Sequence, residues 1–191
     1  MAQYTALFDA CVLYPMGLRD LLMELALTDT FRARWTDEIL DEWVDAIHER
    51  RPDIPKQNLS KQCALMNDHV RDALIENYQG LIPTLSLPDP KDRHVLAAAI
   101  RGRADAIVTF NLKDFPKTTL GQYGIEAQHP DEFLIHLYDL YPAHVVTALK
   151  RVRKRLKNPP YSVAEHMEAL QRYGLVKFVA TLQPDIQLLE F

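Results

Sequence analysis

Short apolar stretches alternate with helix-like segments along the first two thirds of this chain, and this alternation restricts its fold more than any other feature. The clearest stretch is ADAIVTF, residues 104–110, whose apolar character suits a strand buried on both faces. YTALF, residues 4–8, suits a second strand, and residues 121–128 a last one. The alternation predicts an α/β fold in which helices cover both faces of a parallel sheet.

The segments between these strands carry apolar residues at helical spacing. We therefore expect helices over residues 15–29, 36–50, 56–75 and 89–100, and an extended segment over residues 81–87. We assign no element to FRARW, residues 31–35.

After Pro130 the pattern becomes entirely helical. Helices are expected over residues 131–141 and 142–157, and a capping box at Ser162 predicts another helix after the break at Asn158-Pro159-Pro160. We place the boundary near residues 135–141, which divides the chain into a domain of residues 1–135 and a helical extension of residues 136–191 that packs on it.

The charge and the cysteine content restrict which partners the protein can bind and in which compartment it is expected. The net charge of -4 gives no overall attraction to nucleic acid or anionic lipid, so any polyanion site must be local. One local candidate is the run KRVRKRLK, residues 150–157, with six basic residues and no acid. Two cysteines cannot form a disulfide framework, and no apolar stretch is long enough for a bilayer, so we expect a cytoplasmic protein that does not insert into membranes.

Oxygen-bearing side chains follow the predicted strands or flank them. Asp9 ends the first strand, Asp92 lies in the first turn of a helix, and Asn111 and Asp114 follow the strand of residues 104–110. Glu42 lies on the helix of residues 36–50. Ligands of parallel sheets collect at the carboxyl ends of the strands, so these five residues are expected to converge on one cleft.

Each of these residues also has a purely structural interpretation. Asp9 could stabilise the turn after its strand, and Glu42 could be a solvated helix acid, with Glu38 one turn earlier as its rival. Asp89 and Asp92 around Pro90 fit a capping box. Asn111 suits a left-handed turn, and Asp114 suits the cap of a short helix.

A bound cation would neutralise these acids, because clustered carboxylates repel one another. Oxygen ligands without cysteine or histidine favour Mg²⁺ or Mn²⁺ over Zn²⁺. Such an ion typically serves phosphoryl transfer, where it polarises a phosphate and activates water. We expect the histidines His48 and His94 to face solvent.

The chain resembles the PIN-domain nucleases, and especially the VapC-like ribonuclease toxins of bacterial type II toxin–antitoxin systems. The resemblance covers about residues 4–130, and four strings carry it: FDACVLYP, TDEILDEW, LPDPKDRHVLAAAIRGRADAIVTFN and NLKDFP. It implies a three-layer α/β/α sandwich around a parallel sheet. It also implies a cytoplasmic Mg²⁺- or Mn²⁺-dependent hydrolase that cleaves RNA phosphodiester bonds, is held in check by an antitoxin protein, and could form a homodimer.

The resemblance also assigns residues. The metal ligands fall on Asp9, Glu42, Asp92 and Asn111, with Asp114 completing the catalytic set. Thr109 would, by the same analogy, orient the site. From their charge, we expect Lys113, Lys150, Arg151, Arg153 and Lys154 to bind RNA. The alternatives for the basic run are a solvated helix face and a surface that meets an acidic segment of an antitoxin.

Two departures from the family pattern leave an alternative open. Cys11 stands where Asn or Ser is frequent, and Asn111 stands where Asp is common. Fewer negative charges favour one bound ion over two. The two departures also support the alternative of a catalytically inactive PIN-fold module that binds RNA or protein. A receiver-like phosphotransfer domain is the third possibility, but the paired acids it needs after an early strand are missing.

Overall fold

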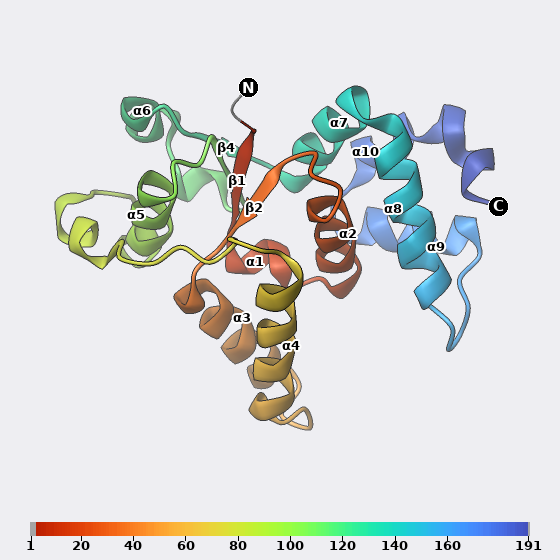
Figure 1. The fold of residues 1–191 in the computed structure, drawn as a ribbon, viewed down its shortest axis with the longest axis horizontal. Coiled ribbons are helices and arrows are strands. Elements are labelled where there is room, and N and C mark those ends of the chain that lie inside the picture. Colours follow the sequence, from red (N-terminus) through yellow and green to blue (C-terminus); the bar gives the residue numbers. More distant parts are fainter. Residues whose placement is uncertain (1–2, 191) are drawn as a thin grey trace.

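A short parallel sheet forms the centre of the protein. The computed structural model describes residues 3–190 and contains one sheet of four parallel strands in the order β2-β1-β3-β4 (Figure 1). The strands are β1 (Thr5–Phe8), β2 (Arg32–Arg34), β3 (Ala106–Val108) and β4 (Glu126–Gln128). The central strands β1 and β3 are buried along their whole length, as their apolar sequences predict. The predicted α/β fold with a parallel sheet is confirmed.

Helices enclose this sheet on both sides. Figure 1 shows α2 (Met16–Ala26) and α5 (Arg93–Arg101) on opposite sides of β1. This placement follows from right-handed crossovers, because the chain moves in opposite directions along the sheet after β1 and after β2. The helix α7 (Pro130–Leu140) packs against β1 through edge-to-face aromatic contacts, with the Phe8 and Phe133 ring centroids 5.9 Å apart.

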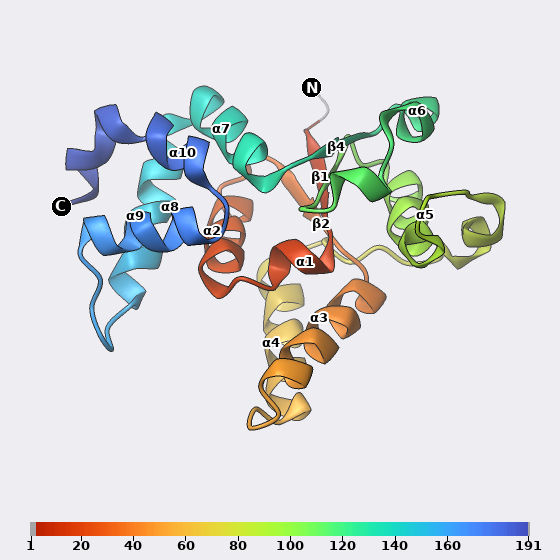
Figure 2. The same cartoon turned by 180° about the vertical axis from the view of Figure 1, so that it is seen from behind.

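The helices α3 (Asp37–Arg50) and α4 (Lys56–His69) form an antiparallel pair that projects from the carboxyl edge of the sheet (Figures 1 and 2). The Thr36 side chain caps α3 by accepting a hydrogen bond from the Ile39 N–H at 3.1 Å. The remaining short elements are α1 (Ala10–Leu13), α6 (Lys117–Leu120) and 3-10 turns at Pro90–Asp92, Leu112–Asp114 and Gly121–Tyr123.

Three expectations fail between β1 and α5. FRARW contains the edge strand β2. Two of its three residues are arginines, so it has no hydrophobic pattern that would predict a strand. The helix predicted to reach residue 75 ends at His69, because the chain turns back so that Trp35 donates to the Ala73 carbonyl at 3.0 Å. The segment of residues 81–87, expected to be extended, is largely the 3-10 helix Gln79–Thr84.

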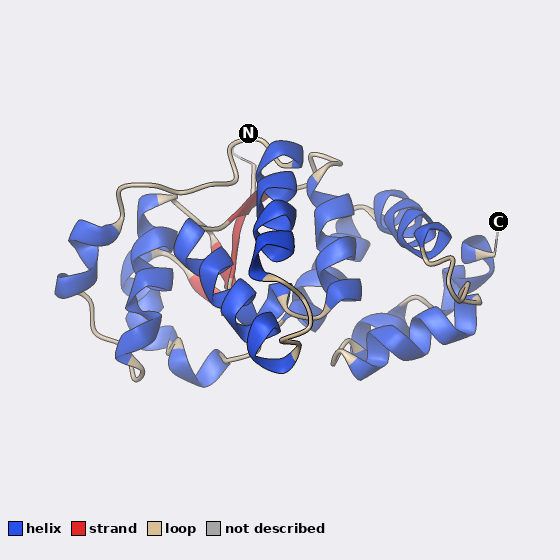
Figure 3. Ribbon diagram, turned by 90° about the horizontal axis from the view of Figure 1, so that it is seen from below, coloured by secondary structure: helices blue, strands red, loops and turns tan. Residues whose placement is uncertain are grey.

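The C-terminal region consists of α8 (Pro142–Arg155), α9 (Val163–Arg172), α10 (Val176–Thr181) and the 3-10 segment Gln183–Leu189, and it forms one flank of the molecule (Figure 3). The capping box predicted at Ser162 is present. The helix α8 lies along α2, where the buried Glu24 carboxylate accepts a hydrogen bond from Arg155 at 2.6 Å. The Tyr173 ring lies so close to Gly17 of α2 that a Cβ there would come within 2.8 Å of it. The division at residues 135–136 stays a prediction.

Within residues 3–190, none of the helices combines the length and the apolar character that a bilayer-spanning helix needs.

Candidate active site

Asp9 and Thr109 meet at the carboxyl edge of the sheet. Their strands are neighbours in parallel register, and the Asp9 N–H donates to the Val108 carbonyl at 3.1 Å. The Asp9 side chain is only 8% exposed, and its Oδ2 accepts a hydrogen bond from the Thr109 hydroxyl at 2.7 Å and from the Cys11 thiol at 3.1 Å. Asp9 occupies the N-cap position of α1, yet among the described residues its carboxylate accepts from these two side chains and not from a backbone N–H of the first turn of the helix. Turn stabilisation alone therefore does not account for its contacts.

The Cys11 thiol remains a hydrogen-bond donor at neutral pH. Burial, and then the charge of Asp9, raise the pKa of Cys11 to about 12. The thiol is therefore protonated and can donate to Asp9, so the departure from Asn or Ser at this position preserves a donor to the first acid.

Asp89 and Asp92 have different surroundings although they lie three residues apart. Asp89 accepts a hydrogen bond from the Lys91 N–H at 2.9 Å and so caps the 3-10 turn. Asp92 precedes α5 without a capping bond from its side chain in the described structure. Burial, and then the charges of Asp9, Asp89, Asp114 and Glu42, raise the pKa of Asp92 to about 6. Capping thus explains Asp89 and leaves Asp92 as an acid held among other acids.

Glu42 and its rival Glu38 both lie next to His94. The prediction that His94 faces solvent is wrong, because its side chain is buried. Its Nε2 lies 3.1 Å from Glu42 Oε1, whereas its Nδ1 lies 3.6 Å from Glu38 Oε2, too far for a hydrogen bond. Burial opposes charge on His94, but the hydrogen bond to Glu42 and the neighbouring carboxylates outweigh it and raise the pKa of His94. Glu38 instead accepts a hydrogen bond from the Tyr78 hydroxyl at 2.8 Å.

Asn111 is tied to the first acid through Thr109. Its backbone N–H donates to the Thr109 hydroxyl at 2.9 Å, so one fully buried hydroxyl links Asn111 and Asp9. Asn111 has a φ of -96° and is not in the left-handed conformation that its structural interpretation requires. Asp114 ends the next 3-10 turn, where its charge acts on Asp92.

These residues line one open cleft of about 450 Å³. Four of the five predicted residues contribute to its wall: Asp9, Glu42, Asp92 and Asn111. Glu38 and Asp114 are absent from the lining of the cleft in the described structure.

The chemistry of these donors fits a hard divalent cation. Carboxylate and amide oxygens face one cleft, and a bound positive charge would relieve the repulsion that raises the pKa of Asp92. Within residues 3–190, however, no three acidic, histidine or cysteine side chains lie close enough together to enclose an ion by themselves. The donor set therefore suits Mg²⁺ or Mn²⁺, ions that retain water ligands, better than an ion that needs a complete protein cage.

Three further polar or charged residues line the cleft without having been predicted: Tyr14, Glu49 and Arg50. Arg50 and Tyr14 both line it, with the Arg50 guanidinium 5.1 Å from the centre of the Tyr14 ring. Helical spacing was the available signal, because Ala46 and Arg50 lie one and two turns after Glu42 on the same face of α3. Arg50 is the one Lys or Arg side chain that contributes to the described lining of this cleft.

The basic run of α8 has structural partners. Arg151 and Arg155 lie 3.5 and 2.6 Å from the buried Glu24 carboxylate. Arg153 donates to the carbonyl oxygens of Tyr161 and Leu189. Lys150 is half-buried, and Lys154 is exposed. Lys113 lies in the exposed turn after Asn111.

A family model described as a PIN domain matches residues 5–113, more than half of the chain. The chain therefore belongs to the PIN-domain family. A second model, described as the VapC50 C-terminal domain, matches residues 130–184. The two matches together agree with the resemblance to VapC-like proteins.

One curated relative carries the name "Putative ribonuclease VapC50" and comes from Mycobacterium tuberculosis. It is 45% identical over 80 residues, which cover 42% of this chain and 47% of the relative. The aligned part of the chain thus spans about half the length of that relative. No solved structure matches the chain.

Proposed function

We propose that this protein is a divalent-metal-dependent endoribonuclease that hydrolyses RNA phosphodiester bonds. The observation that carries the proposal is that Asp9, Glu42 and Asp92, from three separate segments of the chain, line a single cleft. Membership of the PIN-domain family and the relative named as a ribonuclease support this proposal.

In this proposal Asp9, Glu42, Asp92 and Asn111 hold one Mg²⁺ or Mn²⁺ ion. When bound, the ion polarises the phosphate and makes water a stronger nucleophile. Thr109 does not contact RNA, because its hydroxyl is buried; it orients Asp9 and the backbone of Asn111.

His94 has the equivalent positioning role for Glu42. Its Nε2 holds Oε1 of that carboxylate and leaves Oε2 free to face the cleft. Asp114 contributes negative charge next to Asp92.

Arg50 supplies the phosphate contact that we expected from the basic run of residues 150–157. Its guanidinium is held over Tyr14 at the wall of an acidic cleft, where a cation is needed to attract a polyanion. Lys113, next to Asn111, is a second candidate for this contact. Arg151, Arg153 and Arg155 have contacts within the protein, so Lys150, Lys154 and Lys157 of the basic run remain as a more distant contribution to RNA binding.

The resemblance to VapC-like toxins extends this proposal to a biological role. The protein would act as the toxin of a toxin–antitoxin pair in the cytoplasm, and an antitoxin protein would block the cleft. The match of residues 130–184 to the VapC50 C-terminal domain supports this role. A homodimer of this chain is a further part of the proposal.

A cleavage assay with matched variants tests the activity. The purified protein is incubated with Mn²⁺ and a fluorescent single-stranded RNA, alongside Asp9→Asn, Asp92→Asn and Asp89→Asn. The first two variants should lose about 100-fold or more in rate, because each removes a charged ligand. Asp89→Asn should stay within a few-fold of the wild type, since asparagine also caps a helix well. RNA binding by the wild type without cleavage in Mg²⁺ or Mn²⁺ would favour the catalytically inactive binding module instead.

A further inference from the structure

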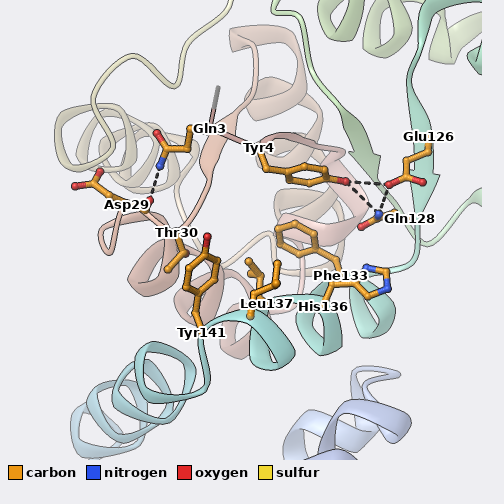
Figure 4. A pocket seen from close by; sticks show the side chains of 11 residues that line it. Gln3, Tyr4, Asp29, Thr30, Glu126, Gln128, Phe133, His136, Leu137 and Tyr141 are labelled. Carbon is orange, nitrogen blue, oxygen red and sulfur yellow. Dashed lines mark hydrogen bonds between the residues drawn. The ribbon is translucent and has the colours of Figure 1, made fainter. Parts of the chain in front are cut away.

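A second cavity lies at the opposite end of the sheet from the candidate active site. It has a volume of about 570 Å³ and is bounded by the residues that precede β1, by β4 and by one side of α7 (Figure 4). Tyr4, directly before β1, lines this cavity, whereas Asp9, directly after β1, lines the cleft described above. The two cavities are therefore separated by the length of the central strand.

Three polar side chains form a hydrogen-bonded cluster at one wall of this cavity. The Tyr4 hydroxyl donates to Glu126 Oε1 at 3.0 Å, and the Gln128 amide nitrogen donates to the same carboxylate and to the Tyr4 oxygen. Burial and the bond to Glu126 raise the pKa of Tyr4, so its hydroxyl keeps the proton.

This cluster leaves one buried acceptor without a donor. The Glu126 carboxylate fixes the orientation of the Gln128 amide, because only the NH₂ end can face a carboxylate. The Gln128 Oε1 therefore points away from Glu126, and within the described residues this buried atom has no hydrogen-bond partner. Gln128 is only 8% exposed, and a buried acceptor without a donor is costly and unusual.

The rest of the lining combines apolar side chains with those of Gln3, Thr30 and His136, and it carries negative charge at its rim. Phe133 and Leu137 form the floor, and Tyr141 lies across the cavity from Glu126 (Figure 4). Glu126 and Asp29 line the cavity, and no Lys or Arg side chain of the described residues does. The cavity thus offers acceptors and negative charge next to a surface that favours an apolar body.

We propose that this cavity binds a guanidinium or ammonium group carried on an aromatic or aliphatic body. The cationic head would donate to Glu126, next to which the unpaired Gln128 oxygen adds further negative potential, while the body packs against Phe133, Leu137 and Tyr141. A guanidinium fits this role well because its several N–H groups form a planar fork. The ligand is either a free organic cation or an arginine side chain of a partner polypeptide.

NMR titration of the full chain tests this proposal with a matched pair of probes. Benzylguanidinium has the required head and body, and benzylurea has the same shape without the charge. Benzylguanidinium should bind saturably and shift the amide signals of Tyr4, Thr30 and Tyr141, and benzylurea should bind about tenfold more weakly or less well still. N-acetylarginine methylamide distinguishes the two sources: saturable binding with the same shifts indicates a partner's arginine, and its failure beside binding of benzylguanidinium indicates a free organic cation.

Variants locate the binding to this cavity. Glu126→Gln should weaken benzylguanidinium binding about tenfold, whereas Glu132→Gln, which removes an exposed acid on α7, should leave it within twofold. Tyr141→Ala leaves the polar cluster untouched and should weaken both probes, which keeps the test valid if Glu126→Gln folds poorly. Equal affinity for the charged and neutral probes, wild-type affinity in Glu126→Gln, or no saturation at about 10 mM probe would each overturn the proposal. None of these outcomes depends on ribonuclease activity.

Discussion

Replacing Thr109 by valine tests whether the buried hydroxyl positions the acidic site. The side chain is completely buried, and its oxygen donates to Asp9 at 2.7 Å and accepts from the Asn111 N–H at 2.9 Å. Valine keeps nearly the same shape but removes both hydrogen bonds. Serine keeps the hydroxyl and loses only a methyl group, so Thr109→Ser is the matched control.

The expected cost of Thr109→Val follows from these contacts. A hydrogen bond to a charged group contributes about 1.5–3 kcal/mol, and one between neutral groups about 1 kcal/mol. The greater hydrophobicity of valine offsets part of this loss, so we expect the free energy of unfolding to fall by about 2 kcal/mol. Thr109→Ser should cost about 1 kcal/mol for the missing methyl group.

The functional consequence separates positioning from stability. With Asp9 no longer held, Thr109→Val should cleave RNA at least tenfold more slowly and should need more Mn²⁺ for half-maximal rate. Thr109→Ser should retain the wild-type Mn²⁺ requirement. Urea unfolding and a Mn²⁺ titration of the cleavage rate measure both effects. Wild-type rate and Mn²⁺ requirement in Thr109→Val would refute the positioning role, whatever its stability.

Three further predictions address other parts of the structure. Glu42→Gln should lower the cleavage rate about 100-fold, whereas Glu38→Gln, outside the cleft lining, should lower it less than threefold. Arg50→Ala should raise KM for RNA about tenfold with little change in kcat, because the guanidinium binds a neighbouring phosphate and not the one that is hydrolysed; Arg50→Lys should restore part of the loss. Burial, and then the charge of Arg153, lower the pKa of His166 to about 4, so the folded state takes up this proton less readily than the unfolded chain. The stability that the neutral imidazole contributes is therefore complete above about pH 6.5 and declines as pH falls toward 4, by at most about 3 kcal/mol. Urea unfolding at pH 7 and pH 4.5 should show this loss, and His166→Gln should abolish its histidine component.

Specific results would contradict each of these predictions. A larger loss of activity in Glu38→Gln than in Glu42→Gln would reverse the assignment of the helix acid. An unchanged KM in Arg50→Ala would remove the guanidinium from RNA binding. The same pH dependence in wild type and His166→Gln would show that folding does not lower the pKa of this imidazole.

The sequence predicted well the elements that local patterns determine. β1 and β3 are apolar throughout because both of their faces are covered, and this makes them visible in the sequence. The Ser162 capping box is equally local. In contrast, β2 consists of an alanine between two arginines at an edge of the sheet, and only its pairing with β1 makes it a strand.

Contacts between distant segments were not predictable in the same way. The burial of His94 depends on α3, which lies more than 40 residues earlier in the chain. The partners of Arg151 and Arg155 depend on the packing of α8 against α2, which places the buried Glu24 beside them. The run of basic residues predicted an RNA-binding surface, but the fold gives all three of its arginines partners within the protein.

Anomalous scattering from crystals grown with Mn²⁺ tests the central claim most directly. We predict one strong peak in the cleft, within coordination distance of carboxylate oxygens of Asp9 and Asp92 and directly or through water of Glu42. The same crystals of Asp92→Asn should show a much weaker peak at that position. A cleft without a peak at Mn²⁺ concentrations that saturate cleavage, or a peak elsewhere on the molecule that Asp92→Asn leaves unchanged, would contradict this account.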